Sequence, residues 1–152
     1  MSFVAKEYMS KNIKSVMPDM NAKDALKLLI KSGMSGLPVL KKSGAIAGVF
    51  TEKEVLSAIL PVYLKKVGEF IYGEDSKHEL KRLAHLGKFQ VKDIMRKEVP
   101  TVTEETSLTE VSKIMLTKSE RRIIVVRGDK AVGVITRSDV VKALAKEAGM
   151  PL

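Results

Sequence analysis

The chain has 152 residues, of which 45% are hydrophobic and 30% charged, a balance typical of globular domains rather than disordered chains. It has no Cys, which excludes disulfides, zinc–thiolate sites and thiol nucleophiles. The formal net charge of +9 suits an anionic partner, but the lysines are scattered and aromatic residues are few, so small anions rank above polynucleotides. No apolar run is long enough for a signal peptide or a membrane span, and we expect a cytoplasmic protein.

The chain repeats one unit twice. Met95 follows Met9 by 86 positions and Thr136 follows Thr51 by 85, so the two copies stay in register except for one residue, which we assign to a turn. The predicted organisation is a first repeat at 1–60, a spacer at 61–88 and a second repeat at 89–148.

The first repeat begins with an apolar segment that ends in Ser15-Val16. A helix with an N-cap at Asn21 is predicted next, because apolar residues recur at helical spacing as far as Gly33. Two β-rich runs, 37–40 and 46–50, flank a polar turn and predict a hairpin, and a second helix is expected over 52–60.

The spacer contains apolar residues at helical spacing, with Pro61 suited to the first turn of a helix and a second helix expected to end near Gly87. It is too apolar for a flexible linker, so we expect it to cover the core or to pack on a second subunit. His78 and His85 lie here, and two histidines do not make a zinc site.

The second repeat has the same order: a helix with an N-cap at Ser107, a hairpin over 123–126 and 131–135, and a helix over 137–146. Each repeat is therefore predicted to be β-α-β-β-α. Gly48 and Gly133 occupy the second strand of each hairpin, where Gly weakens a strand unless a bulge or a close approach of backbone or ligand requires it.

Polar residues gather where the last strand of each repeat leads into its last helix, a geometry that favours an anion. Thr51-x-x-Glu54 has the form of a capping box and is interpreted first as a helix cap. For Thr136-x-x-Asp139 the functional interpretation comes first, because Asp is short for a capping box and can accept two hydrogen bonds from vicinal hydroxyls, as on ribose.

Arg121-Arg122 directly precede a strand of the second repeat, where the first repeat has Ser35-Gly36. The pair has two interpretations: exposed charges that flank a sheet edge, or a fork that clamps phosphates. No Ser-His-Asp set, metal cluster or glycine-rich phosphate loop is present, so neither an enzyme nor a metal site is expected.

These residues give the chain a resemblance to a tandem CBS-domain pair, the regulatory module named after cystathionine β-synthase. The motifs that carry the resemblance are Val91-Lys-Asp-Ile-Met95, Ser35-Gly-Leu-Pro-Val39 and Gly133-Val-Ile-Thr136-Arg-Ser-Asp139. It implies an α+β fold of Bateman type, with two β-α-β-β-α units packed by pseudo-twofold symmetry, clefts between them, and often a homodimer.

The resemblance also implies a regulatory ligand that contains adenosine, such as AMP, ADP, ATP, S-adenosylmethionine or NAD, with no cofactor required. Asp139 would accept ribose hydroxyls, Thr136 and Ser138 would face the ribose-phosphate, and Arg121 and Arg122 would reach phosphates. The adenine slot would be lined by four residues: Thr101, Val102, Thr103 and Ile123. A weaker or empty second site would consist of Ser15, Ser35, Thr51 and Glu54, because Glu54 replaces the expected Asp.

The functional hypothesis is a stand-alone sensor that binds an adenine nucleotide and signals, by a change of conformation, to a separate effector protein. The alternative is a scaffold or nucleic-acid-associated protein with vestigial clefts, whose basic surface or spacer helices make the contacts. The sequence does not separate the adenosine ligands from one another.

Overall fold

The computed structural model describes residues 3–60 and 83–151. The chain divides into two compact units that do not follow the sequence repeats. Unit 1 comprises Met1–Ile13, Ser43–Ile46 and Val99–Leu152, and unit 2 comprises Lys14–Lys42 and Ala47–Glu98. The segment at the start of each repeat thus belongs with the body of the other repeat.

The first repeat contains the predicted helices and hairpin. Its elements are α1 (Ala22–Ser32), β1 (Gly36–Leu40), β2 (Ile46–Thr51) and α2 (Glu52–Ile59). β1 and β2 form a two-stranded sheet. The leading strand is shorter than expected: it amounts to one parallel bridge between Val16 and Val39.

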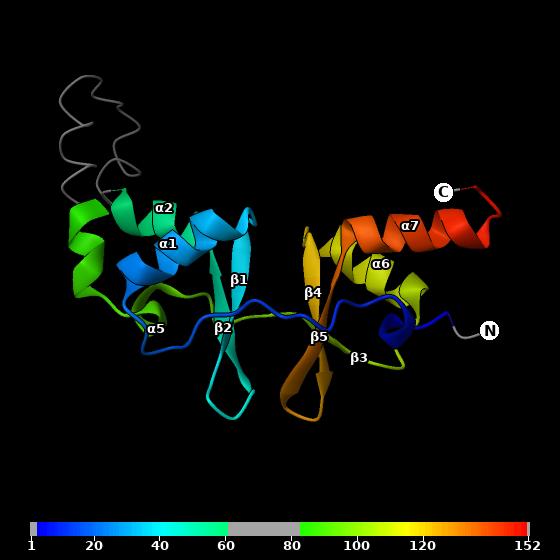
Figure 1. The fold of residues 1–152 in the computed structure, drawn as a ribbon, viewed down its shortest axis with the longest axis horizontal. Helices are drawn as coiled ribbons and strands as arrows, with labels where there is room; N and C mark the ends of the chain where they lie inside the picture. Colours follow the sequence, from blue (N-terminus) through cyan, green and yellow to red (C-terminus); the bar gives the residue numbers. More distant parts are fainter. Residues whose placement is uncertain (1–2, 61–82, 152) are drawn as a thin grey trace, which may run out of the picture. The chain divides into compact units, whose positions relative to one another are not determined.

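The second repeat has the full β-α-β-β-α order. Its elements are β3 (Thr101–Thr103), α6 (Leu108–Thr117), β4 (Arg122–Arg127), β5 (Lys130–Thr136) and α7 (Arg137–Glu147). In the sheet β4 is central, parallel to β3 and antiparallel to β5. The helices α6 and α7 pack together on this sheet (Figure 1).

The first helix of each repeat is capped at its N-terminus by the side chain that the sequence predicted. Asn21 Oδ1 accepts hydrogen bonds from the backbone N–H of Lys23 and Asp24, at 2.9 and 3.4 Å, and Ser107 Oγ accepts from Glu110 N at 3.1 Å. These bonds satisfy amide groups that have no partner within the helix. Gly33 ends α1 with a φ of 71°, a left-handed conformation that glycine adopts without strain.

Each unit has its own apolar core. In unit 2 the core forms between α1, the β1–β2 hairpin and the segment around Val91, with Phe50 and Leu29 among its largest buried side chains. In unit 1 the sheet face that carries Ile123 and Ile135 packs against α6 and α7. Neither core contains a buried polar residue among those described, so apolar burial stabilises both units.

The leading segments are held by backbone hydrogen bonds. In unit 1 the short helix η1 (Ala5–Glu7) docks beside β3, with Ala5 N bonded to Thr106 O at 2.8 Å, and Ser10 pairs with Val134. In unit 2, α5 (Val91–Ile94) leads into the paired residues Val49 and Arg96.

The strand glycines make this docking possible. A Cβ on Gly48 would lie 2.5 Å from Arg96 O and 2.9 Å from Met95 Sδ. A Cβ on Gly133 would overlap Met9 Sδ and lie 3.1 Å from Ser10 O. The close approach of the leading segments therefore requires glycine at both positions. Of the two reasons predicted for a strand glycine, a bulge or a close approach, the structure shows the second at both positions.

Most of the predicted spacer, including Pro61 and His78, lies outside the described residues. Its described end is helical and closes with η2 (Leu86–Lys88). Leu86 is buried in the core of unit 2, with Leu83 packed against that core. The prediction that the spacer covers a core is therefore confirmed for residues 83–88.

Candidate functional site

The N-terminal end of α7, residues 136–139, carries the strongest candidate site in the second repeat and is called the head of α7 below. Thr136 Oγ1 accepts a hydrogen bond from Asp139 N at 3.1 Å, and Asp139 Oδ2 accepts one from Thr136 N at 2.9 Å. This is a reciprocal capping box, so the argument that Asp is too short for one was wrong. It holds the carboxylate in one orientation, and no described group donates to its second oxygen, Oδ1.

The corresponding turn of the first repeat is built differently. Thr51 makes no cap bond to the backbone of α2, so the expected capping box at Thr51 and Glu54 is absent. Instead Thr51 Oγ1 donates to Glu54 Oε2 at 2.9 Å. The longer Glu side chain lies 11% exposed, its Oε1 is 3.8 Å from Arg96 Nε, and that oxygen is buried without a hydrogen bond.

The arginine pair lies beside the head of α7. Arg122 is opposite Thr136 in the β4–β5 register, and Arg137 N donates to Arg121 O at 3.0 Å. Arg121 is exposed and Arg122 is half-buried. Because β4 is the central strand, the interpretation of this pair as charges that flank a sheet edge was wrong.

The residues expected to line an adenine slot differ in exposure. Val102 and Ile123 are buried in the core of unit 1, so their side chains are not available to a ligand. Thr101 and Thr103 are exposed on either side of Val102, and the amide of Thr103 donates to Thr106 Oγ1 at 3.0 Å. Ser138 is exposed in the first turn of α7.

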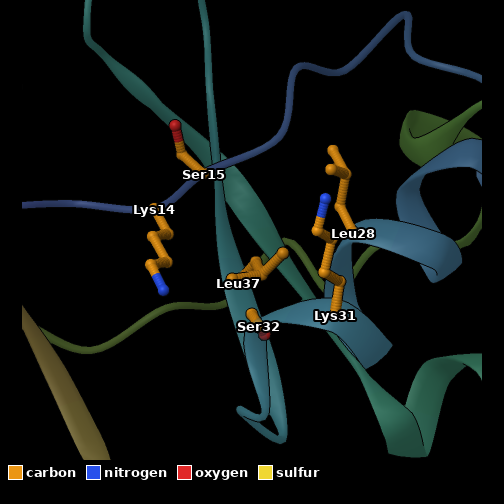
Figure 2. Close-up of a pocket in the computed structure, with 6 residues that line it drawn as sticks. All are labelled: Lys14, Ser15, Leu28, Lys31, Ser32 and Leu37. Carbon is orange, nitrogen blue, oxygen red and sulfur yellow. The ribbon is translucent and has the colours of Figure 1, made fainter.

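Three of the four residues proposed for a second site lie together. Ser35 O accepts a hydrogen bond from Glu52 N at 2.9 Å, which places Ser35 beside the turn that carries Thr51 and Glu54. Ser15 lines a hollow of about 450 Å³ on unit 2 (Figure 2). The residues that line this hollow are Lys14, Ser15, Leu28, Lys31, Ser32 and Leu37.

Sequence reasoning missed the other residues of this hollow. Lys14 comes from the segment that leads to Val16, Lys31 and Ser32 come from the last turn of α1, and Leu37 comes from β1 (Figure 2). From the sequence these lysines were treated only as scattered charges. The spacing of Lys23, Lys27 and Lys31 on one helix face was the available signal.

The described ranges, 3–60 and 83–151, contain neither a cluster of metal-ligating side chains nor a helix that could span a membrane. No three His, Cys, Asp or Glu side chains in them are grouped so that they could hold a metal ion. In the same ranges no helix is long and apolar enough to cross a membrane. His85 is exposed, and His78 lies outside these ranges.

The fold and the two strand-to-helix turns define a protein with a duplicated β-α-β-β-α unit. The CBS domain family matches residues 5–61 and 91–146, and the chain belongs to this family, with two CBS domains. The α+β fold expected for a CBS pair is thus confirmed.

Known proteins of the family resemble the chain over most of its length. The uncharacterised protein MJ1426 of Methanocaldococcus jannaschii is 29% identical, over 91% of this chain and 89% of that protein. The chloroplastic CBS domain-containing protein CBSX1 of Arabidopsis thaliana is also 29% identical, over 93% of this chain and 64% of that protein. The crystal structure of Arabidopsis CBSX2 in complex with AMP has a TM-score of 0.74 at 23% identity and covers 97% of this chain and 99% of that one.

Proposed function

We propose that the protein is a regulatory module that binds an adenosine-containing nucleotide and signals to a separate protein by a change of conformation. The observation that carries this proposal is the head of α7, where a capping box fixes Asp139 and leaves Oδ1 without a described donor. Membership of the CBS family and the AMP complex of CBSX2 support the choice of ligand.

Each predicted residue has a physical role in this proposal. Asp139 Oδ1 accepts a ribose hydroxyl, and the backbone N–H groups at the start of α7 face the phosphate together with the positive end of the helix dipole. Arg121 and Arg122 supply guanidinium groups for phosphate oxygens. The exposed edge of Thr101 and Thr103, with the backbone of Val102 and Ile123, offers hydrogen-bonding groups to adenine.

The proposal extends to assembly and output. Equivalent helix positions in the two repeats expose large apolar side chains: Ile30 is 72% exposed and its counterpart Leu116 is 78% exposed. Such residues favour burial against a second copy, and we propose a homodimer.

Ligand binding changes the output only if two arrangements of the protein bind the ligand with different affinity. The cytoplasmic location expected from the sequence is also a proposal, since relatives include a chloroplastic protein.

Thermal unfolding with adenosine, AMP, ADP, ATP, S-adenosylmethionine and NAD tests the proposal. A ligand at 100 times its dissociation constant stabilises the protein by about 2.7 kcal/mol. We expect one adenosine ligand to raise the midpoint by several degrees in the wild type, and not in Asp139→Ala. Ser107→Ala is the matched control, because it removes the cap of a different helix, α6, and should keep the ligand shift.

If no ligand shifts the midpoint of nucleotide-free protein, the sensor proposal is wrong. Polynucleotide binding that weakens steeply with salt and survives Asp139→Ala would instead favour the nucleic-acid-associated alternative.

A further inference from the structure

We propose that the start of the chain positions the residues that would contact adenine in the second repeat. These residues form β3, and we call 101–103 the adenine edge. The positioning residues are 3–6, at the start of the first repeat, and Arg127, and together we call them the brace. They act by holding the turn 103–106, through which β3 leads into α6. The inference rests on the proposed function, because it requires that the adenine edge binds a base.

The strand β3 is too short to fix its own position. It has three residues and lies at the edge of the three-stranded sheet, parallel to β4. Strands in globular proteins usually have about five or six residues, so β3 offers few ladder hydrogen bonds. Val102 is buried, whereas Thr101 and Thr103 are exposed. The position of these exposed groups therefore depends on what holds the end of the strand.

Thr106 holds the end of β3 from within the turn. Thr103 N donates to Thr106 Oγ1 at 3.0 Å, Thr106 N donates to Thr103 O at 3.1 Å, and the two hydroxyl oxygens are hydrogen-bonded at 3.1 Å. The carbonyl and hydroxyl oxygens of Thr103 each have a second lone pair for a ligand. Because Thr103 is tied to Thr106 at three atoms, a movement of the turn also moves the adenine edge.

Residues 3–6 hold this turn with their backbone (Figure 1). The contacts are Ala5 N to Thr106 O at 2.8 Å, Lys6 N to Glu104 O at 3.0 Å, Leu108 N to Phe3 O at 3.1 Å, and an antiparallel bridge of Val4 with Ser107. Ala5 is also fully buried in the core of unit 1. The segment is thus anchored in the core while its backbone holds the turn.

Two ion pairs hold the same turn through its acidic side chains. Arg127, the last residue of β4, donates from Nε and Nη2 to the two carboxylate oxygens of Glu104, at 2.8 and 3.0 Å. Lys6 Nζ lies 2.7 Å from Glu105 Oε1. Ion pairs as exposed as these contribute little to global stability. A bidentate arginine pair does fix orientation as well as distance, which is what a positioning role requires.

The arginine clamp is specific to the second repeat. The first repeat keeps the equivalent backbone contacts, with Lys92 N bonded to Pro18 O at 2.9 Å and Val91 N to Met20 O at 2.8 Å. Pro18 stands at the position of Glu104, so no carboxylate is available there. The added clamp thus belongs to the repeat that carries the stronger candidate site.

Binding of AMP and of ribose 5-phosphate to the ¹⁵N-labelled protein, followed by nuclear magnetic resonance, tests the brace. Ribose 5-phosphate lacks the base, so the ratio of the two dissociation constants measures the contribution of adenine. We expect Lys6→Ala/Arg127→Ala to raise the dissociation constant of AMP about tenfold and that of ribose 5-phosphate less than about twofold, because only contacts to the base are weakened. Lys113→Ala/Lys130→Ala is the charge-matched control, since both lysines are exposed outside the brace, and it should change neither constant.

Two further measurements do not depend on the stability of the double variant. Lys6→Glu brings like charges together and should weaken AMP binding, and Lys6→Glu/Glu105→Lys should restore it. Because coupling between two sites is reciprocal, AMP should slow hydrogen exchange at the amides of Ala5 and Lys6, and ribose 5-phosphate should not.

The outcomes separate the brace from the proposed function. Equal losses for the two probes, with no effect of AMP on exchange at Ala5 and Lys6, show a merely structural role and overturn the brace while the sensor proposal stands. AMP that binds the wild type no better than ribose 5-phosphate also overturns it, because β3 then binds no base. If the wild type binds neither probe, the brace is overturned, and thermal unfolding with the other adenosine ligands decides the sensor proposal separately.

Discussion

The two strand glycines give a quantitative test of how the leading segments dock. In Gly48→Ala the new methyl group would lie 2.5 Å from Arg96 O, a backbone atom that cannot rotate away. Relief requires Arg96 to move, which strains two backbone hydrogen bonds with Val49, of 2.8 and 2.9 Å. Overpacking costs about 1–3 kcal/mol and each lost hydrogen bond about 0.5–1.5 kcal/mol, so with one of the two bonds lost we expect Gly48→Ala to cost on the order of 2–4 kcal/mol.

Gly133→Ala should destabilise the protein less than Gly48→Ala. Its nearest neighbour is Met9 Sδ, at the end of a flexible side chain, and the backbone atom Ser10 O is 3.1 Å away. A cost of about 1–2 kcal/mol is expected from overpacking. Met9→Ala should recover part of it in a double-mutant cycle, whereas Met95→Ala should not rescue Gly48→Ala, because the Arg96 carbonyl stays in place.

Urea unfolding monitored by circular dichroism measures these costs. Gly87→Ala is the matched control: a Cβ there meets nothing closer than 3.6 Å, and the substitution should be neutral or stabilise by about 0.5 kcal/mol. If Gly48→Ala is as benign as Gly87→Ala, residues 95–96 do not dock on β2 as the structure shows.

Three further predictions follow from the helix caps, a surface ion pair and an exposed apolar position. Thr136→Ala should cost about 1 kcal/mol in urea unfolding, and Thr51→Ala clearly less, because only Thr136 caps its helix; equal costs would contradict the capping geometry. Arg127 donates to Glu104 at 2.8 Å and, chiefly through this bond, lowers the pKa of that carboxyl, so the pair contributes stability above the unfolded-state pKa that is lost as pH falls through the folded-state value. A carbon-detected titration should find the Glu104 pKa raised in Arg127→Ala and unchanged in Lys130→Ala. Leu116→Lys should shift sedimentation from dimer to monomer, and a wild type that is already monomeric refutes the proposed homodimer.

Local patterns in the sequence were sufficient to predict most of the fold. Helix and strand periodicity predicted every helix and strand of the two hairpin-and-helix bodies to within two residues, and Asn21 and Ser107 cap as expected. The partners of the leading segments were not predictable in this way. Residues 3–13 pack with the second repeat and 91–96 with the first, and a repeat pattern assigns each segment only to its own copy.

The site was less predictable, because it depends on distances within a single turn. Thr-x-x-Glu and Thr-x-x-Asp read alike as capping boxes, with Glu the better match. In the structure Asp139 accepts a hydrogen bond from the backbone N–H of Thr136. Glu54 instead accepts one from the hydroxyl of Thr51 and lies close to Arg96. Side-chain length decides which partner is in reach, and the sequence pattern does not contain the position of Arg96.

The two repeats take their cationic groups from different elements. In the first repeat Lys14 and Lys31 flank a hollow beside β1, and the second repeat has Pro100 and Thr117 at these positions. In the second repeat the charge lies at the start of β4, in Arg121 and Arg122, where the first repeat has the neutral Ser35-Gly36. Duplication has thus preserved the backbone while separating the charges, so the two repeats should respond independently to substitution of these groups.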